Sequence, residues 1–434
     1  MTAQTLDKSA NLERNILQAI RGMRDILPHE ASYWQYLERH LAIAAASYGY
    51  QEIRLPIVEQ TALFKRSIGE ATDIVEKEMY TFTDRNNDSL TLRPEGTAVC
   101  VRAGIEHGLF YNQMQRLWYL GPMFRHERPQ KGRYRQFHHF GVEAFGMHGP
   151  QIEAEVILMS AHIWKTLGLS DQVKLTLNSL GSPQVRVAYR QKLVTYFTTC
   201  QNQLDEDSQR RLTTNPLRIL DSKNPAMQPL IAKAPSLHDS LDETSAQDFQ
   251  RLQSLLEKAG IPYAVDPRLV RGLDYYNGTV FEWVTNNLGA QNAVCSGGRY
   301  DGLVELLGGK STPAVGFALG MERVIALLKQ PKNLQENADI YLISGDTTAT
   351  EQLLLLVQQW RLQFSHIRFL MDLSHSNFKH QFKRADKSNA RYAFILGADE
   401  LANKSISIKC LREEKLQISV GWDKVDNFLQ QFHK

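Results

Sequence analysis

Cysteine is scarce in this sequence, and the few that occur have neither metal-binding nor redox spacing. Cys100, Cys200, Cys295 and Cys410 are the four cysteines among 434 residues, and no two of them form a CxxC pair. This spacing excludes a cysteine zinc site and a dense disulfide framework, and reduced thiols are typical of the cytoplasm. We therefore expect a cytoplasmic protein with no metal site built from its own side chains.

Long apolar runs are also missing. The opening residues, MTAQTLDKSANLERN, lack the apolar segment of a signal peptide. The richest apolar stretch near them, HLAIAAASYGY (40–50), is far shorter than the roughly 20 residues that cross a bilayer. A soluble chain with no membrane partner is expected.

Neither a strong net charge nor a common nucleotide-binding loop is present. Lysine and arginine number 50 against 47 acidic residues, so any contact with nucleic acid must be local. The stretch LLGGKST (306–312) ends like a phosphate loop, but Val304 occupies the position of its first glycine, and GxGxxG does not occur. A nucleotide, if bound, is held in another way.

Short β-prone runs dominate the first part of the chain. Between 89 and 146 they alternate with the turn-like RPQKGRY, which is typical of an antiparallel sheet. A helix over 29–48 should precede an extended run containing Pro56, and because proline removes a ladder donor, that strand should lie at an edge. Strands are expected again in TVFEWV and NAVCSGG, followed by a helix at about 312–329.

The length favours two or three domains. Residues 182–259 contain no glycine and carry helical stretches, which predicts a helical insertion. A composition break over 329–339 indicates a linker. Beyond it, β-prone runs (IYLIS, IRFLMD, YAFILG) alternate with expected helices near 350–364, 376–388 and 423–433, which predicts a small α/β domain with a mostly parallel sheet.

Three basic stretches have both a structural and a functional interpretation. In GPMFRHERPQKGRYRQF (121–137), a hairpin tip can be charged merely because it is solvated, yet Arg125 at the end of an apolar strand could hold a phosphate rigidly. In STPAVGFALGMER (311–323), the glycines before Arg323 are consistent with close packing of a helix on a sheet. Alternatively, Arg323 could be a second fixed cation for a phosphate. In NFKHQFKRADK (377–387), phenylalanines and lysines on different faces fit an amphipathic helix or a nucleic-acid surface.

The stretch RGLDYYNGTVFEW (271–283) combines a guanidinium, two adjacent phenols and carboxylates beside a strand. A sheet surface alone does not require that mixture. It is suited to a pocket for a small, charged, ring-bearing ligand.

The strand proline, the Arg125 hairpin and the segment closing on Arg323 resemble, in that order, the three motifs of class II aminoacyl-tRNA synthetases. With AIRGMRDILP (19–28), TLRPEGTA (91–98), RGLDYYNGTVFEW and KRADKSNAR, the sequence is similar to the bacterial-type histidyl-tRNA synthetases. The resemblance runs from about residue 15 to the end. It implies a polar extension (1–14), a class II catalytic domain (15–330) containing the helical insertion, and an anticodon-binding domain (335–434).

The fold implied is α/β, with an antiparallel sheet of six or seven strands flanked by helices and a small C-terminal α/β domain. The resemblance implies a homodimer formed through the first motif, with Pro56 at the interface. The expected ligands are L-histidine, ATP with Mg²⁺ on its phosphates, and tRNA(His), and the expected reaction is formation of histidyl-adenylate followed by transfer to tRNA.

Site residues also follow from the resemblance. Arg125 and Arg271 would be catalytic and grip the α-phosphate, Arg323 the far phosphates, and Glu127 the adenine side. Residues implied to bind histidine are Glu95, Gly96, Thr97, His139, Glu143, Tyr275 and Tyr276, with Glu143 and Tyr276 on the ring and Glu95 and Thr97 on the α-ammonium. Residues implied to bind tRNA are Arg128, Lys131, Arg133, Lys379 and Lys383.

Two positions depart from the family pattern: His139 replaces a usual glutamine, and Gly278 replaces what is often a larger polar residue.

Two alternative functions stay open. One is the histidine-sensing regulatory subunit of ATP phosphoribosyltransferase, whose members lack the C-terminal domain. The other is a pseudo-synthetase that binds uncharged tRNA but loses catalytic arginines. The presence of Arg125, Arg271 and Arg323 favours the active ligase.

Overall fold

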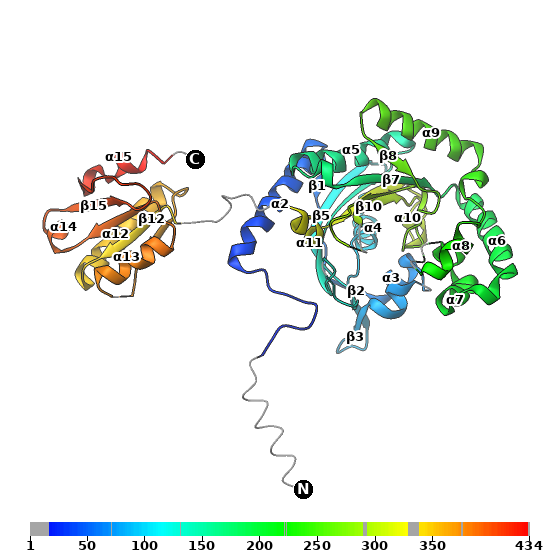
Figure 1. Ribbon diagram of the computed structural model, residues 1–434, viewed down its shortest axis with the longest axis horizontal. Helices are drawn as coiled ribbons and strands as arrows, with labels where there is room; N and C mark the ends of the chain where they lie inside the picture. The colour runs from blue at the N-terminus through cyan, green and yellow to red at the C-terminus, as the bar shows by residue number, and fades with distance from the viewer. Residues whose placement is uncertain are drawn as a thin grey trace, which may run out of the picture. The chain divides into compact units, whose positions relative to one another are not determined.

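The computed structural model describes residues 17–70, 72–130, 132–220, 222, 224–289, 293–328, 338–374 and 376–432. The polar extension over 1–14, Lys131 and most of the expected linker lie outside these ranges. The chain divides into two compact units between positions 331 and 332 (Figure 1). No helix among the described residues is long and apolar enough to cross a membrane.

An eight-stranded sheet forms the centre of the first unit. Its spatial order is β1 (Gln51–Glu52), β5 (Gln115–Phe124), β6 (Gln136–Phe145), β11 (Ala314–Gly320), β10 (Ala293–Arg299), β9 (Asn277–Val284), β7 (Lys174–Ser179) and β8 (Tyr263–Val265). The six central strands pair antiparallel, whereas β1–β5 and β7–β8 at the two ends pair parallel. The predicted antiparallel sheet is therefore confirmed, with eight strands in place of six or seven.

Two sequence expectations about strands were wrong. Residues 314–320 were expected to be helical but form β11 in the middle of the sheet, and only α11 (Met321–Leu327) is a helix there. The run AVGFALG is short and apolar, and such runs do not distinguish a buried strand from a helix by periodicity. Pro56 lies in no strand, but between the edge strand β1 and β2 (Val58–Gln60).

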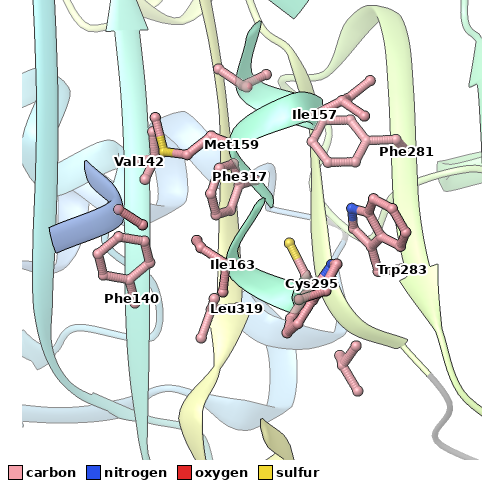
Figure 2. Close-up of a cluster of buried hydrophobic side chains, with 14 of the residues drawn as sticks. Phe140, Val142, Ile157, Met159, Ile163, Phe281, Trp283, Cys295, Phe317 and Leu319 are labelled. Carbon is pink, nitrogen blue, oxygen red and sulfur yellow. The ribbon is translucent and has the colours of Figure 1, made fainter. Parts of the chain in front are cut away.

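Helices cover one face of the sheet and bury its apolar side chains. α2 (Pro28–Ser47), α5 (Pro150–Thr166), α11 and α9 (Glu243–Lys258) contribute to this core. In Figure 2, Phe140 and Val142 of β6 and Phe317 and Leu319 of β11 lie beside Ile157, Met159 and Ile163 of α5. Because alternate strand residues face opposite sides, the intervening residues of β6 and β11 point to the other face, where the site lies.

A small sheet and three helices surround that other face. A second sheet of three strands, β2, β4 (Ser89–Leu92) and β3 (Tyr80–Thr83), lies with α3 (Thr61–Ile68). α4 (Thr97–Glu106) and α10 (Leu303–Leu306) contact α3 and each other.

Gly49 follows α2 with φ +77°, the left-handed conformation that suits glycine after a helix end.

The insertion over 182–259 is helical, as expected. It contains α6 (Pro183–Thr199), α7 (Glu206–Thr214), α8 (Gln228–Ile231) and α9, joined by short 3₁₀ turns. Side chains of Ser182, Asp205 and Asp242 accept backbone N–H groups at the starts of α6, α7 and α9. α9 packs against α5, so the insertion ends within the main core.

The second unit is a five-stranded sheet in the order β13 (Phe369–Met371), β12 (Ile340–Ser344), β14 (Tyr392–Leu396), β15 (Ser405–Cys410) and β16 (Ile418–Gly421). The first three strands pair parallel, as expected, but β15 and β16 are antiparallel and were not predicted. Its helices are α12 (Thr347–Gln363), α13 (Phe378–Lys387), α14 (Ala398–Ala402) and α15 (Val425–Leu429).

Candidate active site

A cavity of about 280 Å³ opens on the sheet face opposite α5. It brings together every residue that the resemblance implies for histidine or ATP, although these come from five separate stretches of sequence. They are Glu95, Gly96, Thr97, Arg125, Glu127, His139, Glu143, Arg271, Tyr275, Tyr276 and Arg323. A single cavity can therefore hold a ligand with both cationic and anionic groups.

Four guanidinium groups line the cavity, those of Arg125, Arg133, Arg271 and Arg323. The Arg125 Nε donates to the Pro94 carbonyl at 2.9 Å, and the Arg323 Nε donates to the Gly132 carbonyl at 3.2 Å. Burial lowers the pKa of both. Arg271 lowers the pKa of Arg125 further, and Arg133 and Arg125 lower that of Arg323 further. An anionic ligand would relieve this repulsion between partly buried cations.

Arg271 stands apart because it is only partly paired. Its Nη1 contacts the Glu282 carboxylate, and its guanidinium lies 5.6 Å from the centroid of the Tyr276 ring. Its Nε is buried and has no hydrogen-bond partner among the residues that the structure describes. A buried donor without a partner costs free energy, and a ligand oxygen in the cavity would satisfy it.

Two carboxylates lie at another part of the cavity. Glu95 accepts the backbone N–H groups of Thr97 and Ala98 at 2.6 and 2.8 Å, at the start of α4. Glu143 accepts the hydroxyl groups of Thr97 at 2.7 Å and Tyr119 at 3.1 Å, and that of Tyr300. Burial raises the pKa of Glu143 to about 8, against the opposing effect of these hydroxyls. Two buried acids favour a ligand that carries positive charge or N–H donors.

Aromatic side chains enclose the same end. The rings of Tyr275 and Tyr276 lie 4.8 Å apart between centroids, and Tyr300 lies 5.6 Å from Tyr275. Burial raises the pKa of Tyr276 to about 12, so its phenol keeps its proton and can donate. The Nδ1 atom of His139 is buried without a partner in the described part of the chain, and burial followed by Arg125 lowers the pKa of this imidazole well below its usual value. His139 is therefore a neutral side chain with a free nitrogen.

Sequence reasoning did not identify Tyr119, Tyr300 or Glu282. Tyr119 fills a slot between Gly96 and Gly141, where an added Cβ on either glycine would overlap its ring. Tyr300 follows Arg299, which pairs with Glu153 in the interior. The signal for Tyr119 is that glycine occupies both positions that face its ring. This signal becomes visible only once the strands are paired.

Close packing at Gly316 gives a testable consequence. A Cβ there would overlap both the Glu143 carboxylate and the Val142 carbonyl oxygen. We expect Gly316→Ala to destabilise the first unit by about 1–3 kcal/mol, because overpacking forces strand backbones apart. Gly302→Ala is the control, since no atom of the described residues lies within 4 Å of a Cβ there. Equal thermal unfolding midpoints for the two variants would contradict this packing.

The residues expected to bind tRNA are dispersed. Arg128, Lys379 and Lys383 are exposed, the last two on α13. Arg133 lines the cavity and pairs with Glu127, and Lys131 lies outside the described residues. The expected apolar face of α13 was wrong in part, because its buried residues are Gln381 and Ala385, and Phe378 is 40% exposed.

Known proteins match both units of the chain. Residues 22–324 match the family model described as histidyl-tRNA synthetase, and residues 341–432 match that of the anticodon binding domain. The apo histidyl-tRNA synthetase of S. aureus is 36% identical, with 96% of this chain and 100% of that chain covered and a TM-score of 0.80.

Two more distant structures share the fold. A histidyl-tRNA synthetase from Nostoc sp. PCC 7120 is 19% identical, with 96% of this chain and 99% of that one covered and a TM-score of 0.67. A Bacillus halodurans C protein, described as an ATP phosphoribosyltransferase regulatory subunit/histidyl-tRNA synthetase, is 22% identical over 88% of this chain and 98% of its own, with a TM-score of 0.64. Because the family model spans most of the first unit and the S. aureus match spans nearly the whole chain, this protein belongs to the histidyl-tRNA synthetase family of aminoacyl-tRNA ligases.

Proposed function

We propose that this protein activates L-histidine with ATP and transfers the histidyl group to tRNA(His). One observation carries the proposal: a single cavity joins the buried acids Glu95 and Glu143 and a tyrosine wall to partly buried arginines. The acids and phenols are suited to an amino acid with a polar ring, and the arginines to a polyphosphate. The direct test is histidine-dependent exchange of pyrophosphate into ATP, followed by charging of tRNA.

In the first step, a carboxylate oxygen of histidine attacks the α-phosphorus of ATP. The bond from that phosphorus to the bridging oxygen breaks, and pyrophosphate leaves with the electron pair. Arg125 and Arg271 would bind the α-phosphate, with Arg271 also reaching the carboxylate, while Arg323 binds the distal phosphates and Glu127 lies on the adenine side. The protein supplies position and positive charge, and no side chain acts as a nucleophile.

Mg²⁺ fits this site as a companion of ATP. Among the described residues, no group of three or more histidine, cysteine, aspartate or glutamate side chains could hold a metal ion. Mg²⁺ commonly binds through one or two carboxylates and substrate phosphates, and Glu282 in the cavity wall could supply a carboxylate. When bound, the ion would neutralise part of the phosphate charge.

The histidine ring would lie between Glu143 and Tyr276, with Tyr275 beside it. The neutral imidazole has one donor and one acceptor, which a carboxylate and a phenol can match. Glu95 and Thr97, beside Gly96, would bind the α-ammonium group. The free nitrogen of His139 gives this position a hydrogen-bonding role in place of the family's usual glutamine.

In the second step, a hydroxyl at the 3′ end of tRNA attacks the histidyl carbonyl carbon, and AMP leaves. Exposed Arg128, with Lys131 and Arg133 of the same hairpin, would contact the RNA backbone. Lys379 and Lys383 on α13 would contact the anticodon region, because the second unit matches an anticodon-binding family.

A homodimer is part of the proposal. Apolar side chains near the first motif are exposed in the single chain, among them Ile43 at 62%, Ile57 at 41% and Phe82 at 44%. A second copy would bury them. A cytoplasmic location is proposed as well, from the cysteine usage alone.

The alternative function is that of a histidine sensor without ligase activity. A sensor requires the buried acids that bind histidine, but it has no use for three arginines arranged to bind a polyphosphate. Their retention favours the ligase. Histidine binding without pyrophosphate exchange or tRNA charging would favour the sensor.

The pKa of Glu143 gives a prediction about pH. If the carboxylate accepts the ring N–H of histidine, kcat/KM for histidine rises with pH through about 8, because the free protein is protonated at Glu143 below that value. Glu143→Gln should lack this rise and, above pH 8, should lower kcat/KM about ten- to a hundredfold by raising KM for histidine.

The measurement is pyrophosphate exchange as a function of pH for both proteins, with KM for ATP as the internal control. Titration of histidine itself affects both proteins equally and cancels in the ratio. A wild-type rise that persists in Glu143→Gln would assign it to another group.

A further inference from the structure

The segment 271–276 separates two hollows of the first unit. Arg271 and Leu273 line the active-site cavity, and the same two residues line a small crevice on the opposite side. The crevice is otherwise formed largely by the helical insertion, including Arg186, Asn215 and Arg218. The segment that carries Arg271, Tyr275 and Tyr276 therefore has the insertion directly behind it.

Two insertion side chains bind this segment. The Arg186 Nη1, on α6, donates to the carbonyl oxygens of Asp274, at 3.3 Å, and Tyr276. The Asn215 Nδ2, at the end of α7, donates to the Asp274 Oδ1 at 2.6 Å. We call Arg186 and Asn215 the clasp.

The clasp supplies bonds that the segment does not make by itself. Residues 266–276 form no helix or strand, so their backbone groups depend on partners elsewhere. Asp274 N–H donates to the Ile68 carbonyl at 3.2 Å, but the Asp274 and Tyr276 carbonyls are bonded by Arg186. Arg186 thus fixes the backbone on both sides of Tyr275.

The same part of the insertion also holds the segment after α3. Arg211 and Arg218 contact the Asp73 carboxylate at 3.3 and 3.4 Å, and Arg210 contacts Glu76 at 3.0 Å. The guanidinium of Arg218 also lies against Gly272, where an added Cβ would be 2.7 Å from its Nη1. The segment 271–276 and the segment after α3 are therefore tied to the same helical unit.

We propose that Arg186 and Asn215 are positioning residues for histidine activation, through which the helical insertion sets the placement of Arg271 and Tyr276. This inference rests on the proposed function, because it assigns the activation step to those two side chains. Neither clasp residue lines the active-site cavity. Their effect is exerted through the backbone of 274–276.

The test compares Arg186→Gln with Arg186→Lys in the full-length protein. We expect Arg186→Gln to lower kcat of pyrophosphate exchange about ten- to a hundredfold, since a displacement near 1 Å can cost that much. KM for histidine should rise, and KM for ATP should rise less, because Arg125 and Arg323, which also bind its phosphates, are untouched. Arg186→Lys should recover part of the loss, since an ammonium can still donate to a carbonyl. Lys192→Gln removes an exposed charge from the same helix and is the control.

A double-mutant cycle distinguishes positioning from loss of folded protein. In an Arg271→Ala background, Arg186→Gln should lower kcat far less than in the wild type, because its effect on rate passes through Arg271. Equal fold losses of kcat in both backgrounds would overturn the proposal. So would a smaller fraction of active protein with an unchanged KM for histidine.

Amide hydrogen exchange provides a readout that does not need activity. Peptides covering 268–278 should exchange faster in Arg186→Gln than in Lys192→Gln, while peptides of β5 and β6 stay equally protected. Unchanged protection over 268–278 would contradict the clasp. If the wild-type protein showed no pyrophosphate exchange, the proposed function would be refuted. The hydrogen-exchange comparison would still test whether Arg186 holds the segment.

Discussion

Replacing Arg271 with alanine should lower the rate of histidine-dependent pyrophosphate exchange about a hundred- to a thousandfold. The reason is the Nε of this partly buried guanidinium in the cavity wall, which has no partner among the described residues and can bind the negative charge that develops as the carboxylate attacks phosphorus. The fold should survive, because Arg271 contributes one ion pair, to Glu282, and a ring contact with Tyr276.

Arg268→Ala is the matched control, since Arg268 is exposed and pairs with Asp266 close by in sequence. Arg125→Ala should cause a loss of similar size, and the double variant should lose less than the product of the two, because both arginines bind one phosphate. Near-normal exchange in purified Arg271→Ala would remove this residue from the mechanism.

Deleting residues 335–434 should spare much of histidine activation while severely reducing the charging of tRNA. All residues of the cavity precede the deletion, and the chain divides into compact units between positions 331 and 332. The deleted unit matches the anticodon-binding family and carries the exposed Lys379 and Lys383. Lost phosphate contacts should weaken tRNA binding and flatten its dependence on salt, because fewer counterions are released.

The comparison is KM for tRNA and the charging rate of both proteins at two salt concentrations. Sedimentation of the truncated protein checks that its oligomeric state matches that of the full chain. Point substitutions test the same claim without removing the domain. Lys379→Gln and Lys383→Gln should each weaken tRNA binding, and Lys424→Gln, which changes an exposed lysine outside α13, is the control. If the truncated protein charged tRNA as well as the full chain, the second unit would not read the anticodon.

Sequence patterns predicted the elements whose signals are local. The helix that ends before Gly49, the Arg125 hairpin and the helical insertion all have periodicity or turn residues within a single window. The strand β11 was mistaken for a helix because AVGFALG lacks such a signal, and its place was decided by pairing with β6 and β10. β15 and β16 were missed because SISIKC and ISVG are short and flank a polar turn.

The candidate site was predictable where a motif names its residues, and unpredictable where packing alone decides. Glu143 and Arg271 lie in recognisable stretches, whereas Tyr119 enters the site only because Gly96 and Gly141 leave room for its ring. Arg186 reaches Asp274 and Tyr276 across 88 and 90 positions of sequence. No local pattern can indicate contacts at such separations, because they depend on the assembled fold.

The most direct test of the account is pyrophosphate exchange into ATP by the full-length protein, with and without L-histidine, followed by charging of tRNA(His) by the same preparation. We predict that exchange depends on histidine and that the same preparation then attaches histidine to tRNA(His). A protein that binds histidine but neither exchanges pyrophosphate nor charges tRNA would contradict the account and favour a histidine sensor built on the synthetase fold.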